Sequence, residues 1–193
     1  MAGHGHGHGH GGDHEGGDKR IALLISVLAL LLAISETGGK SAQTEAISKN
    51  VEAANLWAFF QARSIRQTIV TSAADQAELG RAAAADEVAR QAITRQQERW
   101  RNSAQRWESE PETGEGRREL ASRARAAEEK REKSMAAYHL FEYGSAAYQV
   151  AIVLASSSIV TAVPLLALGG AGLGAVGLGL TVLAFVKPDI LHH

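Results

Sequence analysis

Uncharged residues are segregated into two blocks, and this segregation constrains the fold more than any other feature of the sequence. Residues 21–34 and 146–186 contain no Asp, Glu, Lys or Arg. The residues between them, 40–145, carry 17 Lys or Arg and 16 Asp or Glu. A soluble globular domain spreads its apolar residues periodically to form one core. The blocks instead predict a chain matched to two solvents, a lipid bilayer and water.

The first uncharged block predicts a membrane-spanning helix over residues 19–39. A span needs about 20 residues, so we extend the short apolar run to the polar residues that follow it and to Lys19 and Arg20, whose long side chains reach the interface. A cleaved signal peptide is the alternative, because small residues stand at Ala33 and Ser35 after a basic start. The long glycine-rich leader favours a retained helix.

The second uncharged block predicts two further spans, at 146–168 and 171–187, followed by a short tail at 188–193. Gly169 and Gly170 are expected to form the turn between them. Glycines on the last helix permit close contact between helices in lipid. We therefore predict a set of helix-packing residues: Gly170, Gly172, Gly174, Gly177 and Gly179.

The polar region 40–145 is rich in good helix formers and predicts helices over 41–79, 82–108 and 117–145. Proline and glycine place a tip at 109–116, so the last two helices are expected to form an antiparallel pair. The third helix should run on into the second span. Its small and apolar residues have the spacing of a coiled-coil seam: Leu120, Ala124, Ala127, Arg131, Ser134, Tyr138 and Phe141. The predicted class is all-α and integral membrane, with three spans and a coiled-coil-like extramembrane segment.

One face of the segment 41–79 is apolar at helical spacing: Ile47, Val51, Ala54, Ala58, Ile65, Ile69 and Leu79. Aromatic residues beside it suit the headgroup region, and nearby arginines can pair with lipid phosphate. The predicted membrane-interface set is Lys19, Arg20, Leu56, Trp57, Phe59, Phe60, Arg63 and Arg66. Bundle core is the alternative for the aromatics. Three spans require the segment to lie on the membrane or to bend near Thr71 and Ser72.

The amino-terminal residues 1–18 form a His- and Gly-rich tail, expected to be disordered. Its imidazoles are candidate ligands for a divalent transition metal such as Zn²⁺: His4, His6, His8, His10 and His14. A solvated linker or a purification tag is the alternative reading. No other cofactor is expected.

Composition argues against most catalytic and nucleic-acid-binding classes. The net charge is −1 and there is no cysteine, so neither a nucleic-acid partner nor thiol chemistry is expected. Gly172, Gly174 and Gly177 match a dinucleotide-binding spacing but lack its strand–turn–helix context. His139 and Glu142 lie one turn apart, and a metal site there would need partners from other helices. We expect a protein that is not an enzyme.

Several blocks resemble the bacterial membrane proteins grouped as DUF4337: residues 19–25, 35–37, 40–45, 55–63, 65–67, 108–111 and 138–143. The most specific block is Asn-Leu-Trp-Ala-Phe-Phe-Gln at 55–61. The resemblance implies a multi-pass protein of the bacterial inner membrane, an all-helical build and no catalytic residue. The distribution of Lys and Arg beside the spans places the central region in the cytoplasm.

These features predict a membrane-anchored helical scaffold that self-associates, with the lipid bilayer and further copies of the chain as partners. A subunit of a transport or channel assembly is one alternative, although the spans lack the central charge that ion pathways usually contain. A metal-binding protein that acts through the His-rich tail is the other.

Overall fold

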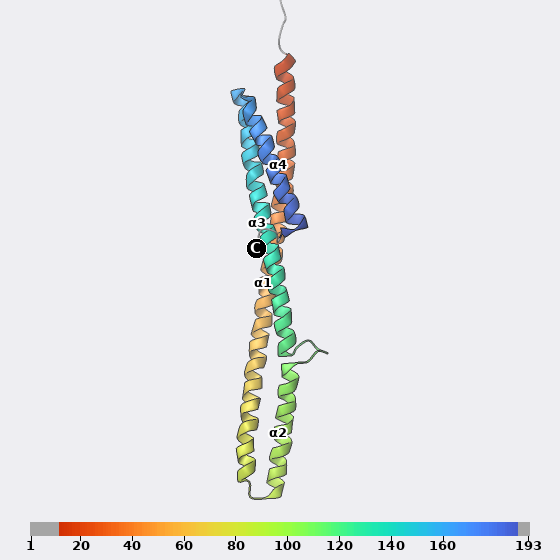
Figure 1. Ribbon diagram of the computed structural model, residues 1–193, viewed down its shortest axis with the longest axis vertical. Coiled ribbons are helices and arrows are strands. Elements are labelled where there is room, and N and C mark those ends of the chain that lie inside the picture. The colour runs from red at the N-terminus through yellow and green to blue at the C-terminus, as the bar shows by residue number, and fades with distance from the viewer. Residues whose placement is uncertain (1–11, 189–193) are drawn as a thin grey trace, which may run out of the picture. The chain divides into compact units, whose positions relative to one another are not determined.

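The protein is made of four α-helices in a computed structural model that describes residues 12–188, with side chains from residue 17 onward. The helices are α1 (Gly12–Ala83), α2 (Glu87–Glu108), α3 (Arg117–Thr161) and α4 (Pro164–Val186) (Figure 1). No strand occurs in this part of the chain. Helices α1, α3 and α4 each contain a segment long and apolar enough to cross a membrane. The predicted all-α class with three candidate spans is confirmed.

The helices divide into two compact units. The span unit comprises residues up to Glu45 together with those from Lys133 onward, and contains the candidate membrane segments. The arm unit comprises Ala46–Glu132 and contains most of the charged residues.

Helix α1 is unbroken from Gly12 to Ala83, so the expected span at 19–39 and the expected helix at 41–79 belong to one helix and not to two. Thr71 and Ser72 lie inside this unbroken helix, so the helix has no break at the site of the alternative bend. Gly38 and Gly39 do not break α1, because they are sites of close packing. A Cβ added at Gly39 would lie 3.2 Å from Cβ of Phe141, and one at Gly38 would lie 2.7 Å from its ring.

In the arm unit, α2 folds back along α1 after a connection at residues 84–86 (Figure 1). Asp86 caps α2, since its Oδ1 accepts a 2.7 Å hydrogen bond from the backbone N–H of Ala89. Gln97 is buried and its Nε2 donates to the carbonyl oxygen of Ala74 at 2.9 Å. The predicted pairing of the second and third helices about residues 109–116 is therefore wrong, because the partner of α2 is α1.

The first turns of α3 pack against an earlier stretch of α1 and form the apolar core of the arm unit. Ala53 and Leu56 of α1 meet the buried seam residues Leu120, Ala124 and Ala127. Helix α1 is thus the common partner of α2 and α3. These three residues of the coiled-coil-like seam therefore pack against α1 of the same chain.

The span unit packs residues of α1, α3 and α4 around two apolar clusters, centred on Tyr148 and Leu28 and on Phe141 and Ala184. Helix α3 ends at Thr161 and α4 begins at Pro164, so the expected turn at Gly169–Gly170 is wrong. Proline suits the first turn of a helix, where its missing N–H costs nothing. Ala162 adopts a left-handed φ of 54°, and the Ser158 hydroxyl donates to the Val163 carbonyl at 2.9 Å.

Candidate functional site

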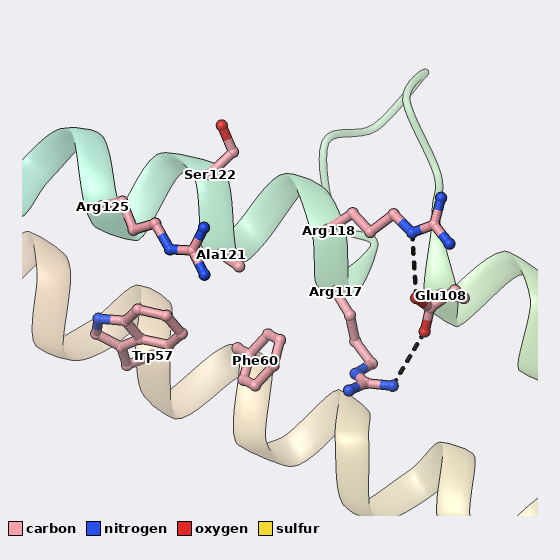
Figure 2. Close-up of a pocket in the computed structure, with 8 residues that line it drawn as sticks. All are labelled: Trp57, Phe60, Glu108, Arg117, Arg118, Ala121, Ser122 and Arg125. Atoms are coloured by element: carbon pink, nitrogen blue, oxygen red, sulfur yellow. Dashed lines mark hydrogen bonds and ion pairs between the residues drawn. The ribbon is translucent and has the colours of Figure 1, made fainter.

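A pocket of about 460 Å³ lies in the arm unit where α1, the end of α2 and the start of α3 meet (Figure 2). Two aromatic side chains of α1 form one wall, and α3 supplies three arginines while α2 supplies one carboxylate. The lining residues are Trp57, Phe60, Glu108, Arg117, Arg118, Ala121, Ser122 and Arg125. Charged and aromatic side chains from three helices therefore meet at this pocket, which makes it the candidate site for chemistry.

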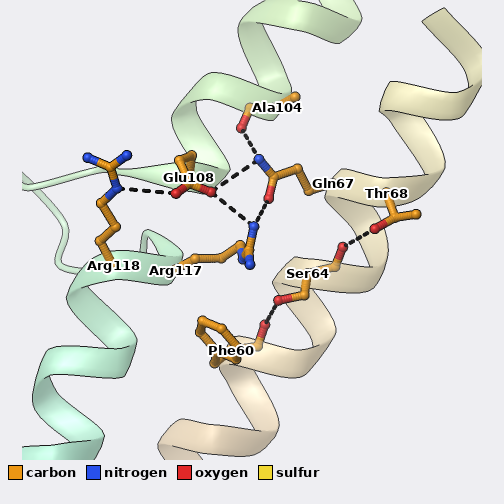
Figure 3. Close-up of polar contacts among 8 residues, drawn as sticks. All are labelled: Phe60, Ser64, Gln67, Thr68, Ala104, Glu108, Arg117 and Arg118. Carbon is orange, nitrogen blue, oxygen red and sulfur yellow. Dashed lines mark hydrogen bonds and ion pairs between the residues drawn. The ribbon is translucent and has the colours of Figure 1, made fainter. Parts of the chain in front are cut away.

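Glu108 is the centre of the polar contacts at this junction. Arg117 Nη1 donates to Glu108 Oε2 at 3.0 Å, and Arg118 Nε donates to Oε1 at 3.2 Å (Figure 3). Gln67 Nε2 donates to both Glu108 Oε2 and the Ala104 carbonyl at 3.3 Å, and its Oε1 accepts from Arg117. One carboxylate thus joins three helices.

The guanidinium of Arg117 lies over the ring of Phe60, with 5.2 Å between the guanidinium carbon and the ring centroid. Arg117 Nε is buried and is the one buried side-chain polar atom among the described residues that has no hydrogen-bond partner. A cation over an aromatic face is stabilised by the ring quadrupole. This contact offsets part of the cost of leaving the Nε hydrogen unbonded.

The environment holds the pKa of Glu108 below its usual range. The main cause is the hydrogen bond from Gln67, followed by the hydrogen bond from Arg118 and the positive charges of Arg117 and Arg118, while burial opposes them. Glu108 is therefore ionised at neutral pH, and each oxygen already accepts from a neighbouring helix. A general base needs a pKa near the working pH and access to a substrate proton. The pKa of Glu108 is instead shifted away from neutral pH, and both of its oxygens already accept hydrogen bonds.

The loop at 109–116 is fixed by the first turn of α3. Glu119 accepts hydrogen bonds from the Ser109 hydroxyl at 2.6 Å and from the Glu110 backbone N–H at 3.2 Å. These donors, the Ser109 hydroxyl first, lower the pKa of Glu119. Gly116 permits the close approach, because a Cβ there would lie 2.7 Å from Cα of Ser109.

Half of the eight predicted membrane-interface residues have contacts inside the arm unit. Leu56 is buried in its core, and Trp57 and Phe60 pack against that core. Trp57 Nε1 donates to Glu128 at 2.8 Å, and Arg63 pairs with Glu115 of the loop at 2.6 Å. For Trp57 and Phe60, these contacts agree with the alternative that the aromatic residues belong to the core of a helical bundle.

The remaining members of that set are exposed. The side chains of Lys19, Arg20, Phe59 and Arg66 lie at the surface. Contact of this surface with lipid headgroups stays a prediction.

The five predicted packing glycines of α4 fall on two faces. Gly170, Gly174 and Gly177 are buried. A Cβ at Gly170 would lie 2.8 Å from the Ala151 carbonyl oxygen, one at Gly177 would lie 2.9 Å from the Tyr148 ring, and one at Gly174 would collide with Leu28. Gly172 and Gly179 have open space beside them. The first three therefore line contacts with α1 and α3.

Sequence reasoning missed a buried hydroxyl cluster that joins the three helices of the span unit. Ser35 Oγ of α1 donates to the Phe141 carbonyl at 2.9 Å, and Thr181 Oγ1 of α4 donates to the Gly177 carbonyl at 2.9 Å. Thr181 Oγ1 lies 3.3 Å from both Ser35 Oγ and the Tyr148 hydroxyl. The signal in the sequence was a hydroxyl-bearing residue in or beside each apolar run: Ser35, Tyr148 and Thr181.

The structure does not test the predicted metal site of the amino-terminal tail. His4, His6, His8 and His10 lie outside the described residues, as does the side chain of His14. Within the rest, no group of three or more metal-binding side chains occurs. His139 Nδ1 lies 3.5 Å from Glu142, and both side chains are partly exposed.

Comparison with known proteins gives one result. The family model named DUF4337, a domain of unknown function, matches residues 17–187 of this chain. Comparison with curated proteins and with solved structures gives no match.

Proposed function

We propose that this chain, which belongs to the DUF4337 family, is a membrane-anchored helical scaffold that associates with further copies of itself. One observation carries the proposal. The charged and aromatic side chains around Glu108 and Arg117 bond to one another and join helices. Catalysis requires a group that remains available to a substrate, whereas a scaffold requires rigid junctions.

The span unit supports the anchoring part of the proposal. Its buried hydroxyls on Ser35, Tyr148 and Thr181 accept from or donate to one another and to backbone carbonyls. A transport pathway usually contains charged or unpaired polar groups at membrane depth. We therefore place the lipid bilayer first among the partners and the bacterial inner membrane as the location, with the arm unit in the cytoplasm.

The proposal is tested by the mass of the full-length protein in detergent, measured by light scattering with correction for bound detergent. The expected result is a dimer or a larger assembly whose mass persists on dilution to the low micromolar range. A strict monomer at every concentration would remove self-association from the proposal. Carbonate washing of membranes tests the anchor separately, since an integral protein stays in the pellet and a peripheral protein is released.

A further inference from the structure

Helix α1 has two apolar faces within the arm unit, and only one of them is covered. Residues such as Ala53, Leu56 and Ala74 are buried on the inner face. The opposite face carries five large apolar side chains that are 53–74% exposed: Ile47, Val51, Ile65, Ile69 and Leu79. We call these five residues the α1 stripe.

Small residues complete the α1 stripe and keep it continuous. Ala54, Ala58 and Ala62 lie between Val51 and Ile65 and are also exposed. Spacings of three and four residues connect these positions from Ile47 to Ile69, and Leu79 lies on the same line of the helix ten residues further on. The sequence predicted this face, and the structure leaves it without a partner while α2 and α3 occupy the other side of α1.

We infer that the α1 stripe is the contact for a second copy of this chain, aligned parallel and in register. The inference rests on the self-association proposed above and names the surface that makes it. The seam of α3 is unavailable in the arm unit, because Leu120, Ala124 and Ala127 are buried against α1.

The charges beside the α1 stripe fit a pair of identical helices. In a parallel in-register pair one flank of each helix faces the opposite flank of its copy, so many like charges on both flanks would repel. The flanks are largely uncharged: Ser48, Asn50, Asn55, Gln61 and Thr68. By contrast, α2 carries Arg95, Arg99 and Arg106 at exposed positions.

The same neutral flanks argue against a membrane surface as the occupant. A helix that lies on an anionic bilayer is typically rich in Lys and Arg on its polar face. Near the α1 stripe, Arg66 is matched by one acidic residue, Asp75, on the other flank. A second copy is therefore favoured over lipid.

The exposed area is sufficient for a specific contact. The exposed fractions of the five large residues add up to about three fully exposed aliphatic side chains. Complete burial of one such side chain removes on the order of 90 Å² of apolar surface from water. Two copies would thus bury about 550 Å² of apolar surface. Since a little over half of a typical interface is apolar, the total is near the roughly 1,000 Å² that a specific interface needs.

A shared bilayer favours the parallel arrangement. Copies inserted in one membrane have the same orientation, and the α1 stripe is part of the same uninterrupted helix as a candidate span. Confinement of the copies to one membrane also raises their effective concentration, so a modest interface can suffice.

The test uses single cysteines in the full-length chain, which has no native cysteine. Ala54→Cys and Ala62→Cys place thiols on the α1 stripe, where an in-register pair brings each thiol within disulfide distance of its own copy. Ala92→Cys on α2 and Ala126→Cys on α3 are matched controls, because both alanines are exposed and off the stripe. In liposomes under mild oxidation, we expect the two stripe positions to cross-link at least about tenfold faster than the controls.

A charge-exchange experiment tests the register. Ile65→Glu and Ile65→Lys should each remove the dimer when expressed alone, because identical charges then face each other. When the two variants are expressed together, opposite charges meet and the mixed dimer should return. Ile65 is exposed, so circular dichroism should show unchanged helix content in each variant.

The outcomes separate this inference from the proposed function. A dimer by light scattering without preferential cross-linking at the α1 stripe overturns the inference and leaves self-association standing. A monomer together with absent cross-links overturns both. Stripe cysteines that are shielded from a water-soluble maleimide but form no disulfide would assign the α1 stripe to lipid, which also overturns the inference.

Discussion

Replacing Glu108 by Gln removes the charge at the junction of α1, α2 and α3 while preserving the shape of the side chain. Arg117 and Arg118 then lose their ionic partner, although the amide oxygen can still accept one hydrogen bond. A hydrogen bond to a charged group is worth about 1.5–3 kcal/mol, and the side chains here are 30–73% exposed, so solvent screening reduces the effect. We expect a loss of about 1–2 kcal/mol.

The assay is thermal unfolding of the full-length protein in detergent, followed by circular dichroism at pH 7. For a unit of this size, 1 kcal/mol lowers Tm by about 4–8 °C. Glu98→Gln is the matched control, because Glu98 is exposed on the same helix and should change Tm by less than about 2 °C. Equal Tm values for Glu108→Gln and the control would refute the role assigned to this junction.

The pH dependence of the same variant has a definite sign. The pKa of Glu108 is lowered in the folded protein, first by the Gln67 hydrogen bond. The stabilisation is therefore present above the unfolded pKa, near 4.3, and is lost as the pH falls through the folded pKa. The Tm difference between wild type and Glu108→Gln should be full at pH 7 and shrink as the pH falls below about 4. A difference that grows on acidification would contradict the assigned environment.

Three further substitutions probe other contacts. Leu120→Ala should cost about 2–5 kcal/mol in chemical unfolding, because Leu120 is buried in the arm core, whereas exposed Val88→Ala should cost less than about 1 kcal/mol. Gly116→Ala should cost about 1–3 kcal/mol in the same assay, because the new Cβ meets the backbone of Ser109; an unchanged midpoint would contradict this. Thr181→Val should lower the stability of the span unit by about 0.6–1.7 kcal/mol in detergent unfolding, and a gain would show that the hydroxyl cluster is dispensable.

The sequence predicted the all-α class and the three candidate spans correctly because both follow from local pattern. Uncharged blocks identify spans by length alone, and the Ala-, Glu- and Arg-rich region between them favours helices. The start of α3 at Arg117 and the end of α2 at Glu108 agree with the boundaries that Pro111 and Gly114 indicated.

Helix pairing could not be predicted in the same way. The apolar face of α1 at Ile47, Val51 and Ile65 is the stronger periodic signal, yet the structure covers the other face. That face includes the buried small residues Ala53 and Ala74 and the half-buried Gln67. Small residues let helices approach closely, and buried amides then bond to the neighbouring backbone. Hydrophobic periodicity therefore identified a real surface but did not show what it contacts.

The error at glycine has a physical cause. Gly169 and Gly170 were expected to form a turn, but both lie inside α4, and Gly170 faces Ala151. Gly38 and Gly39 likewise lie inside α1, where they face Phe141. Glycine is a frequent packing residue in membrane helices, and the actual turn is marked by Pro164 at the start of α4.

The most direct test of self-association counts the copies of the chain in a bilayer. Full-length protein carrying one fluorophore at a single introduced cysteine is diluted into liposomes, and photobleaching steps are counted for each vesicle across a wide range of protein-to-lipid ratios. A membrane-anchored scaffold that pairs through α1 predicts a majority of two-step traces that persists on dilution until the dissociation constant is reached, and a shift to single steps in Ile65→Glu. Single-step traces at every ratio, identical in wild type and variant, would contradict it.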